Sequence, residues 1–118
     1  MRTTIALVIL VLCASTEATA SCSRNEHGVF EDPACASEAF AKADKKLNEL
    51  YQKLLLQLNE EAQTKLRASQ SAWLAYRDEA TAFVYAIEGN GSAGRMIAAN
   101  QREQATIARI KELRPWLR

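Results

Sequence analysis

The 118-residue sequence has few of the residues on which catalytic and metal sites depend. It contains one histidine and three cysteines, and its acidic residues do not group with them at metal-ligand spacing. We therefore expect no metal site and no cofactor. Basic and acidic residues are nearly balanced, 15 against 14, so no strong positive field indicates a nucleic-acid partner. Four glycines and two prolines are too few for a low-complexity linker.

The first 20 residues have the features of a secretory signal peptide. A positive charge precedes an apolar run at residues 5–13, which is shorter than the roughly 20 residues of a membrane span. Residues 18–20 then fit the small-x-small cleavage rule. We predict cleavage after residue 20, a periplasmic or secreted protein and no membrane span. Lipid anchoring at Cys22 is not expected, because Thr19 stands where lipoprotein signals have a larger aliphatic residue.

Two cysteines remain after cleavage, Cys22 and Cys35. An even pair in an exported chain favours a disulfide, which would stabilise a loop of this length by about 3 kcal/mol. The alternative is a pair of free thiols. The CxxC spacing of redox enzymes is absent, so oxidoreductase chemistry is not expected.

The mature chain predicts one all-α domain over residues 34–118, preceded by an aperiodic leader at 21–33. Asp32-Pro33 is typical of a helix start, and apolar residues then recur in steps of three and four as far as Leu58. A second helix is expected from Asn59 to Glu88. The apolar stripe assigned to its packing face is Ala62, Leu66, Ser69, Trp73, Tyr76, Ala80, Phe83, Val84 and Ile87.

Residues 89–94 (GNGSAG) are the clearest break in the chain, and a third helix is expected from Arg95 to Leu113, with Pro115 ending it. Short connections make neighbouring helices antiparallel. The predicted fold is therefore an antiparallel hairpin of two long helices plus a third helix, stapled near the N-terminus by one disulfide.

No constellation of side chains indicates an enzyme. His27 lies alone in the leader, and Ser92 lacks the strand-turn-helix context of a nucleophile. Arg77 follows Trp73 by one helical turn, and its fork suits a carboxylate such as Asp44 or Glu49. We interpret this tryptophan as core and this arginine as a structural tie between helices.

Two spacings within the helices form a longer pattern. They are A-D-x-x-L-N-x-x-Y at residues 43–51 and Q-x-x-W-x-x-x-R-D at residues 70–78. Together with the glycine-rich loop, this pattern resembles the LprI-type lysozyme inhibitor family, small exported helical domains of bacteria. The motif residues, expected to be structural, are Asp44, Leu47, Asn48, Tyr51, Gln70, Trp73, Arg77 and Asp78. Family members resemble this chain in the early cysteine pair. Many have a second pair, where this sequence has Thr81 and Gln101.

The resemblance implies a non-catalytic binding protein whose partner is lysozyme or another peptidoglycan hydrolase. The loop at residues 89–94 would enter the enzyme's cleft, with Asn90, Ser92 and Arg95 as its polar contacts. The alternative for this loop is a plain turn between two helices. The alternative is an envelope interaction module, or an immunity-type protein, with no lysozyme target. Animal lysozymes are strongly basic, and a net charge of +1 offers them no electrostatic steering.

Overall fold

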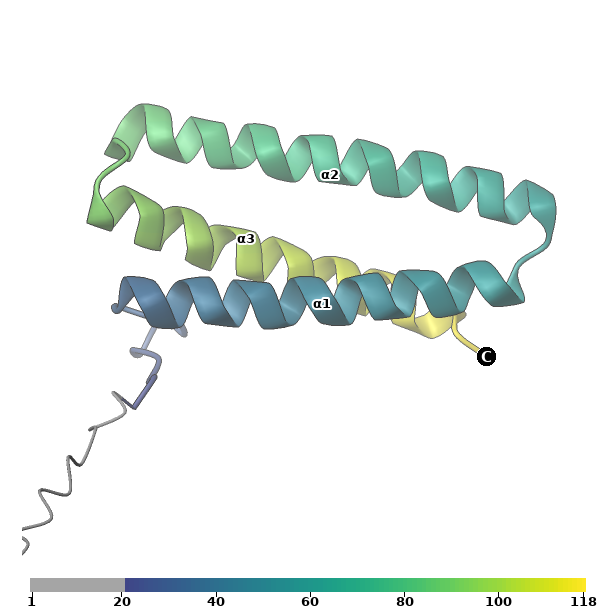
Figure 1. The fold of residues 1–118 in the computed structure, drawn as a ribbon, viewed down its shortest axis with the longest axis horizontal. Helices are drawn as coiled ribbons and strands as arrows, with labels where there is room; N and C mark the ends of the chain where they lie inside the picture. The colour runs from purple at the N-terminus through teal and green to yellow at the C-terminus, as the bar shows by residue number, and fades with distance from the viewer. Residues whose placement is uncertain (1–20) are drawn as a thin grey trace, which may run out of the picture.

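The computed structural model describes residues 21–118, and the predicted signal peptide lies outside these residues. Three α-helices make up the fold: α1 (Pro33–Gln57), α2 (Glu60–Glu88) and α3 (Ser92–Leu113), followed by the short 3-10 helix η1 (Arg114–Trp116) (Figure 1). Residues 21–118 contain no strand beyond a single isolated bridge in the leader. The prediction of an all-α fold is confirmed.

The starts of the first two helices follow from local capping. The Asp32 side chain accepts a hydrogen bond from the Cys35 amide at 2.8 Å, and Pro33 occupies the first turn of α1. The Asn59 side chain accepts from the Ala62 amide at 2.9 Å and caps α2. Only two residues therefore separate α1 from α2, and the two helices run antiparallel.

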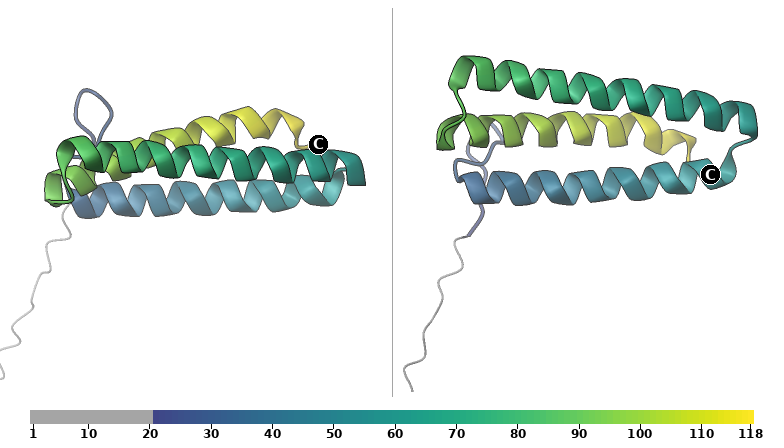
Figure 2. Two further views of the ribbon diagram at one scale, coloured as in Figure 1. Left: turned by 90° about the horizontal axis from the view of Figure 1, so that it is seen from above. Right: turned by 45° about the horizontal axis from the view of Figure 1, so that its top comes forward.

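Helix α3 lies between the other two helices and supplies most of the packing. It runs parallel to α1 and contacts it over much of its length, contacts α2 less extensively, and leaves α1 and α2 with little direct contact (Figures 1 and 2). The predicted hairpin with a third helix is confirmed. The third helix holds the two arms of the hairpin together.

The core is a leucine-rich seam between α1 and α3. Its buried residues are Leu47, Leu50 and Leu54 of α1 with Ile110 and Leu113 of α3. Leu66 and Trp73 of α2 are only partly buried against this seam. A smaller cluster under the leader contains Phe30, Cys35, Ala36 and Ala99.

The packing face expected for α2 is partly wrong. Leu66 and Trp73 do face the core, whereas Tyr76, Phe83 and Ile87 are each about two-thirds exposed. The buried residues of α2 are instead polar: Gln70, Arg77 and Thr81. The apolar stripe and the polar row are centred about 85° apart around the helix. Hydrogen bonds from the polar row to the other helices select the face that turns inward.

The third helix begins three residues earlier than expected, at Ser92 and not at Arg95. Gly91 is its N-cap residue, and the Arg95 amide donates to the Gly91 carbonyl oxygen at 3.0 Å. The connection between α2 and α3 is therefore only Gly89–Gly91, which we call the glycine turn. None of the described helices is long and apolar enough to span a membrane.

Candidate functional site

A charged layer joins all three helices near the middle of the bundle. Arg77 Nη1 of α2 donates to Asp44 Oδ1 of α1 at 2.6 Å and to Thr106 Oγ1 of α3 at 3.1 Å. The guanidinium also lies over the rings of Phe40 and Trp73, at 5.2 and 4.9 Å from their centroids. Of the two carboxylates expected for Arg77, the structure has Asp44 as its partner.

A second polar layer fixes the register between α2 and α3. Arg109 Nε of α3 donates to Gln70 Oε1 at 3.1 Å, and its Nη2 donates to Ser69 Oγ at 2.7 Å. Gln70 and Arg109 are both buried. Arg109 belongs to the family pattern of the sequence, but sequence reasoning gave it no role, although polar residues at core spacing in the third helix are a signal that could have done so.

The family-motif residues fall into two groups in the structure. Leu47 is fully buried in the core, and Tyr51 is half-buried on α1. Asn48 and Asp78 are exposed to solvent. The interior of the bundle therefore brings together Asp44, Leu47, Gln70, Trp73 and Arg77, and it leaves the other two polar residues at the surface.

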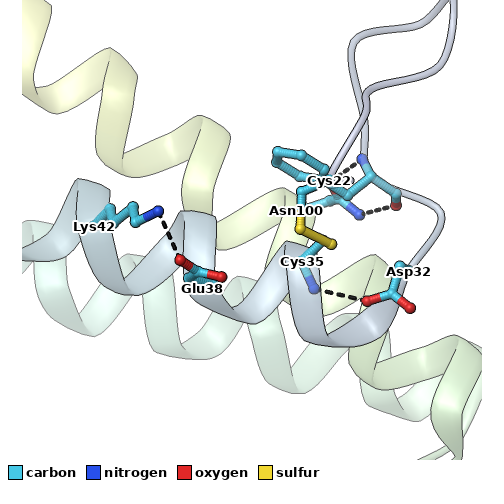
Figure 3. The surroundings of a disulfide bond; sticks show 7 residues. Cys22, Asp32, Cys35, Glu38, Lys42 and Asn100 are labelled. Atoms are coloured by element: carbon cyan, nitrogen blue, oxygen red, sulfur yellow. Dashed lines mark hydrogen bonds and ion pairs between the residues drawn. A yellow bond between two sulfur atoms is a disulfide. The ribbon is translucent and has the colours of Figure 1, made fainter. Parts of the chain in front are cut away.

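The leader is fixed to the bundle by the predicted disulfide and by two polar contacts. Cys22 and Cys35 are bonded, with their Cα atoms 5.5 Å apart (Figure 3). Asn100 of α3 accepts from the Phe30 amide and donates to the Phe30 carbonyl oxygen, both at 2.8 Å.

Arg24 makes the second polar contact of the leader. Its guanidinium forms a two-pronged pair with the Glu103 carboxylate of α3, at 2.5 and 2.9 Å. Hydrogen bonding to Glu103 raises the pKa of Arg24 above its usual value. The Glu103 side chain is almost completely buried, so this pairing compensates for its desolvation. The neighbouring Glu38 is exposed on α1, and its hydrogen bond from Lys42 lowers its pKa.

The glycine turn is held in one conformation by close backbone packing. Gly89 has φ +76°, which favours glycine, and its amide donates to the Tyr85 carbonyl oxygen at 3.0 Å. Gly94 packs so closely against the carbonyl of Gly89 that any Cβ at this position would overlap it. Arg95 Nη1 donates to the Asn90 carbonyl oxygen at 2.8 Å and closes the turn.

The residues predicted to contact a partner lie together at this end of the bundle. Asn90, Ser92 and Arg95 are all exposed, as is Gly91, where a Cβ would meet no other atom within 4 Å. The structure therefore presents a short turn whose residues are open to solvent at one end of the bundle. Whether a partner binds there remains a prediction.

The nearly neutral chain is electrically divided along its length. Taking the Arg77–Asp44 layer as the boundary, residues 21–43 and 78–105 contain four Lys and Arg against eight Asp and Glu. Residues 44–77 and 106–118 contain ten Lys and Arg against five Asp and Glu. The half with the glycine turn thus has a net charge of −4, and the other half of +5. The half with the glycine turn therefore has a charge opposite to that of a basic protein, although the net charge of the whole chain is only +1.

Residues 21–118 contain no group of three His, Cys, Asp or Glu side chains able to hold a metal ion. His27 is exposed in the leader, where the nearby Glu26 is the only carboxylate that the structure pairs with it. The charged groups of the interior are occupied in ties between helices, as described above. What the arrangement offers chemically is shape, hydrogen bonds and charge at a surface.

Of three comparisons with known proteins, one found a match. Neither the search of curated proteins nor that of solved structures found a match. The family model described as lysozyme inhibitor LprI matches residues 15–113, which is most of the chain. The protein therefore belongs to the LprI lysozyme inhibitor family.

Proposed function

We propose that this protein is an exported, non-catalytic inhibitor that binds a basic lysozyme and blocks its cleft with the glycine turn. Family membership supports the inhibitor class. The observation that carries the proposal is the turn itself, which is exposed to solvent and in which Gly94 packs closely on the Gly89 carbonyl. An ordered turn binds without first losing conformational entropy, which favours affinity.

The charge division along the bundle supports the same end of the molecule as the contact surface. Animal lysozymes are strongly basic, and the half with the glycine turn has a net charge of −4. Opposite charges raise the association rate and favour encounter through this half. Arg95 is the exception, and its hydrogen bond to the Asn90 carbonyl gives it a structural role within the turn.

We propose further that the protein acts in the periplasm or in the medium. The family, the predicted signal peptide and the disulfide between Cys22 and Cys35 all fit an oxidising compartment outside the cytoplasm. Since the Cys22 sulfur is occupied, the mature chain would diffuse freely to its target.

The test is a lysis assay with the purified mature protein and a basic animal lysozyme. We expect wild-type protein to inhibit lysis of a cell-wall suspension, and Gly91→Trp to inhibit at least about tenfold less, because the indole prevents the turn from entering a cleft. Gly91 has ordinary φ of −78° and open space around it, so the variant should fold normally.

The matched control is Ala68→Trp, which places the same bulk on an exposed position of α2 in the other half. It should inhibit as the wild type does. No inhibition by wild-type protein at a large molar excess would reject the proposal. An envelope module or immunity-type protein without a lysozyme target would then be the better interpretation.

A further inference from the structure

Three large apolar side chains of α2 face solvent, two of them in the half with the glycine turn and one, Tyr76, next to the Arg77–Asp44 layer that bounds it. Tyr76, Phe83 and Ile87 are 66%, 65% and 64% exposed. Their spacings of seven and four residues place them on one side of the helix, and Glu79 lies between the first two on the same side. We call these four residues the α2 strip. It is about 16 Å long, since its ends are 11 residues apart.

The α2 strip is not an accident of an unpacked helix. The same stretch of α2 is firmly attached to the bundle by its other side, through Arg77 to Asp44 and Thr106. In this stretch of α2, polar side chains therefore point inward and the large apolar side chains of the strip point outward. This is the reverse of the arrangement in a monomeric surface helix. A row of exposed bulky apolar residues on a well-anchored helix marks an interaction surface.

The surroundings of the strip determine which kind of partner it suits. Residues 78–94 contain three acidic residues and no Lys or Arg. A basic surface rich in Arg and Lys matches this, since such side chains stack on aromatic rings and pair with a carboxylate such as Glu79. A strongly acidic or nucleic-acid surface would be repelled.

The strip is also continuous with the glycine turn. Ile87 lies two residues before Gly89, so the strip leads along α2 directly to the exposed turn. Figure 1 shows α2 at the edge of the bundle, with its outer side free along its whole length. A partner that receives the turn would therefore lie against the strip.

We infer that the α2 strip is the principal docking surface for the basic lysozyme, with the glycine turn as a smaller contact at its end. This inference rests on the proposed function and deepens it, because it assigns most of the binding energy to a helix face outside the loop. A few apolar and aromatic residues at the centre of an interface usually dominate its affinity.

The test measures binding to a basic animal lysozyme by surface plasmon resonance and inhibition by the lysis assay. Phe83→Ser combined with Ile87→Ser should weaken binding at least about tenfold, with an unchanged melting temperature because both residues are exposed. Glu79→Lys should weaken binding and reduce its salt dependence. Leu56→Ser, which alters an 87% exposed residue of α1 in the basic half, should leave both readouts unchanged.

The outcomes separate the two proposals. If wild-type protein inhibits and the strip variants bind equally well, the α2 strip is wrong and the inhibitor function stands. If the strip variants weaken binding but the wild-type protein does not inhibit lysozyme, the docking role of the strip is supported and the inhibitor function is wrong. Absence of binding rejects both. A dimer in sedimentation equilibrium that the strip variants abolish would assign the strip to self-association and overturn the inference.

Discussion

Arg77 of α2 and Asp44 of α1 form a part-buried ion pair at 2.6 Å, although the two helices otherwise have little contact. The Arg77 side chain is only 8% exposed, and the same nitrogen donates to Thr106 of α3. One guanidinium thus joins three helices. The pair determines which side of α2 turns inward and, with it, which side is left for a partner.

Replacing Arg77 should destabilise the fold strongly. We expect Arg77→Ala to lower the free energy of unfolding by about 3 kcal/mol, because it leaves Asp44 without a partner and removes the group stacked on Trp73. Arg77→Lys should recover little, since an ammonium cannot reproduce the stacking of the planar guanidinium on the Phe40 and Trp73 rings. Urea denaturation measures both. Arg67→Ala, at an exposed position of the same helix, is the control and should change stability by less than about 0.5 kcal/mol.

Trp73 and Trp116, the two tryptophans, should behave differently. Trp73 packs partly against the leucine core, whereas Trp116 is 68% exposed in η1. We expect Trp73→Ala to cost about 3 kcal/mol and Trp116→Ala less than about 1 kcal/mol. Fluorescence of Trp116→Phe, which isolates Trp73, should be blue-shifted relative to Trp73→Phe. A cost below about 1 kcal/mol for Trp73→Ala would show that its packing is not structural.

Breaking the Cys22–Cys35 bond should loosen the leader while the helices remain. We expect Cys22→Ser with Cys35→Ser to lose about 3 kcal/mol, from a loop of sequence separation 13. Hydrogen exchange should accelerate over residues 21–32 more than in α3. Asn100→Ala in the disulfide-bonded protein tests the second attachment, the paired hydrogen bonds to Phe30. Free thiols in protein purified from the periplasm would contradict this prediction.

Of the two glycines at the start of α3, replacement by alanine should destabilise the fold at Gly94 and leave its stability nearly unchanged at Gly91. At Gly94 a Cβ would overlap the Gly89 carbonyl, and the backbone must move, so we expect Gly94→Ala to cost about 1–3 kcal/mol. At Gly91 the added methyl meets nothing, so Gly91→Ala should be nearly neutral. Thermal denaturation of the two variants side by side checks the close packing of the turn. Equal stability of both would show that this packing is absent.

Cysteines at positions 81 and 101 should form a second disulfide. The contacts Arg77–Thr106 and Gln70–Arg109 set an antiparallel register that places Thr81 level with Gln101. Thr81 is buried, and Gln101 Oε1 is buried without a hydrogen-bond partner in the described chain. We expect Thr81→Cys with Gln101→Cys to stabilise the fold by about 3 kcal/mol. Mass spectrometry that finds both new thiols free would show that the α2–α3 register is different.

Much of the fold could be predicted from local signals. Asp32-Pro33, Asn59 and Pro115 are capping and breaking residues that act within one turn of helix, and the observed helices begin or end beside them. The start of α3 was misplaced by three residues. Small residues such as Ser92 and Ala93 read as loop, although Gly91 caps a helix that includes them.

The candidate site was less predictable, because it depends on contacts between distant segments. Gln70 and Arg77 have polar side chains that do not indicate an interior position, and they can be buried only because Arg109 and Asp44 supply partners. Glu103 likewise needs Arg24, 79 residues away, to be buried. The periodicity of apolar residues contains no information about such partners, so it assigned Tyr76 and Phe83 to the core.

By itself, the sequence determined that the chain is helical, where the helices are interrupted, which cysteines pair and which family pattern the chain carries, since each depends on neighbouring residues or on residue identity. Only the tertiary structure decided that α3 is the central helix, that α2 turns its polar row inward, and that acidic and basic residues separate along the bundle. These properties arise where side chains from three helices meet, because a charged or polar side chain can be buried only where another segment supplies its partner.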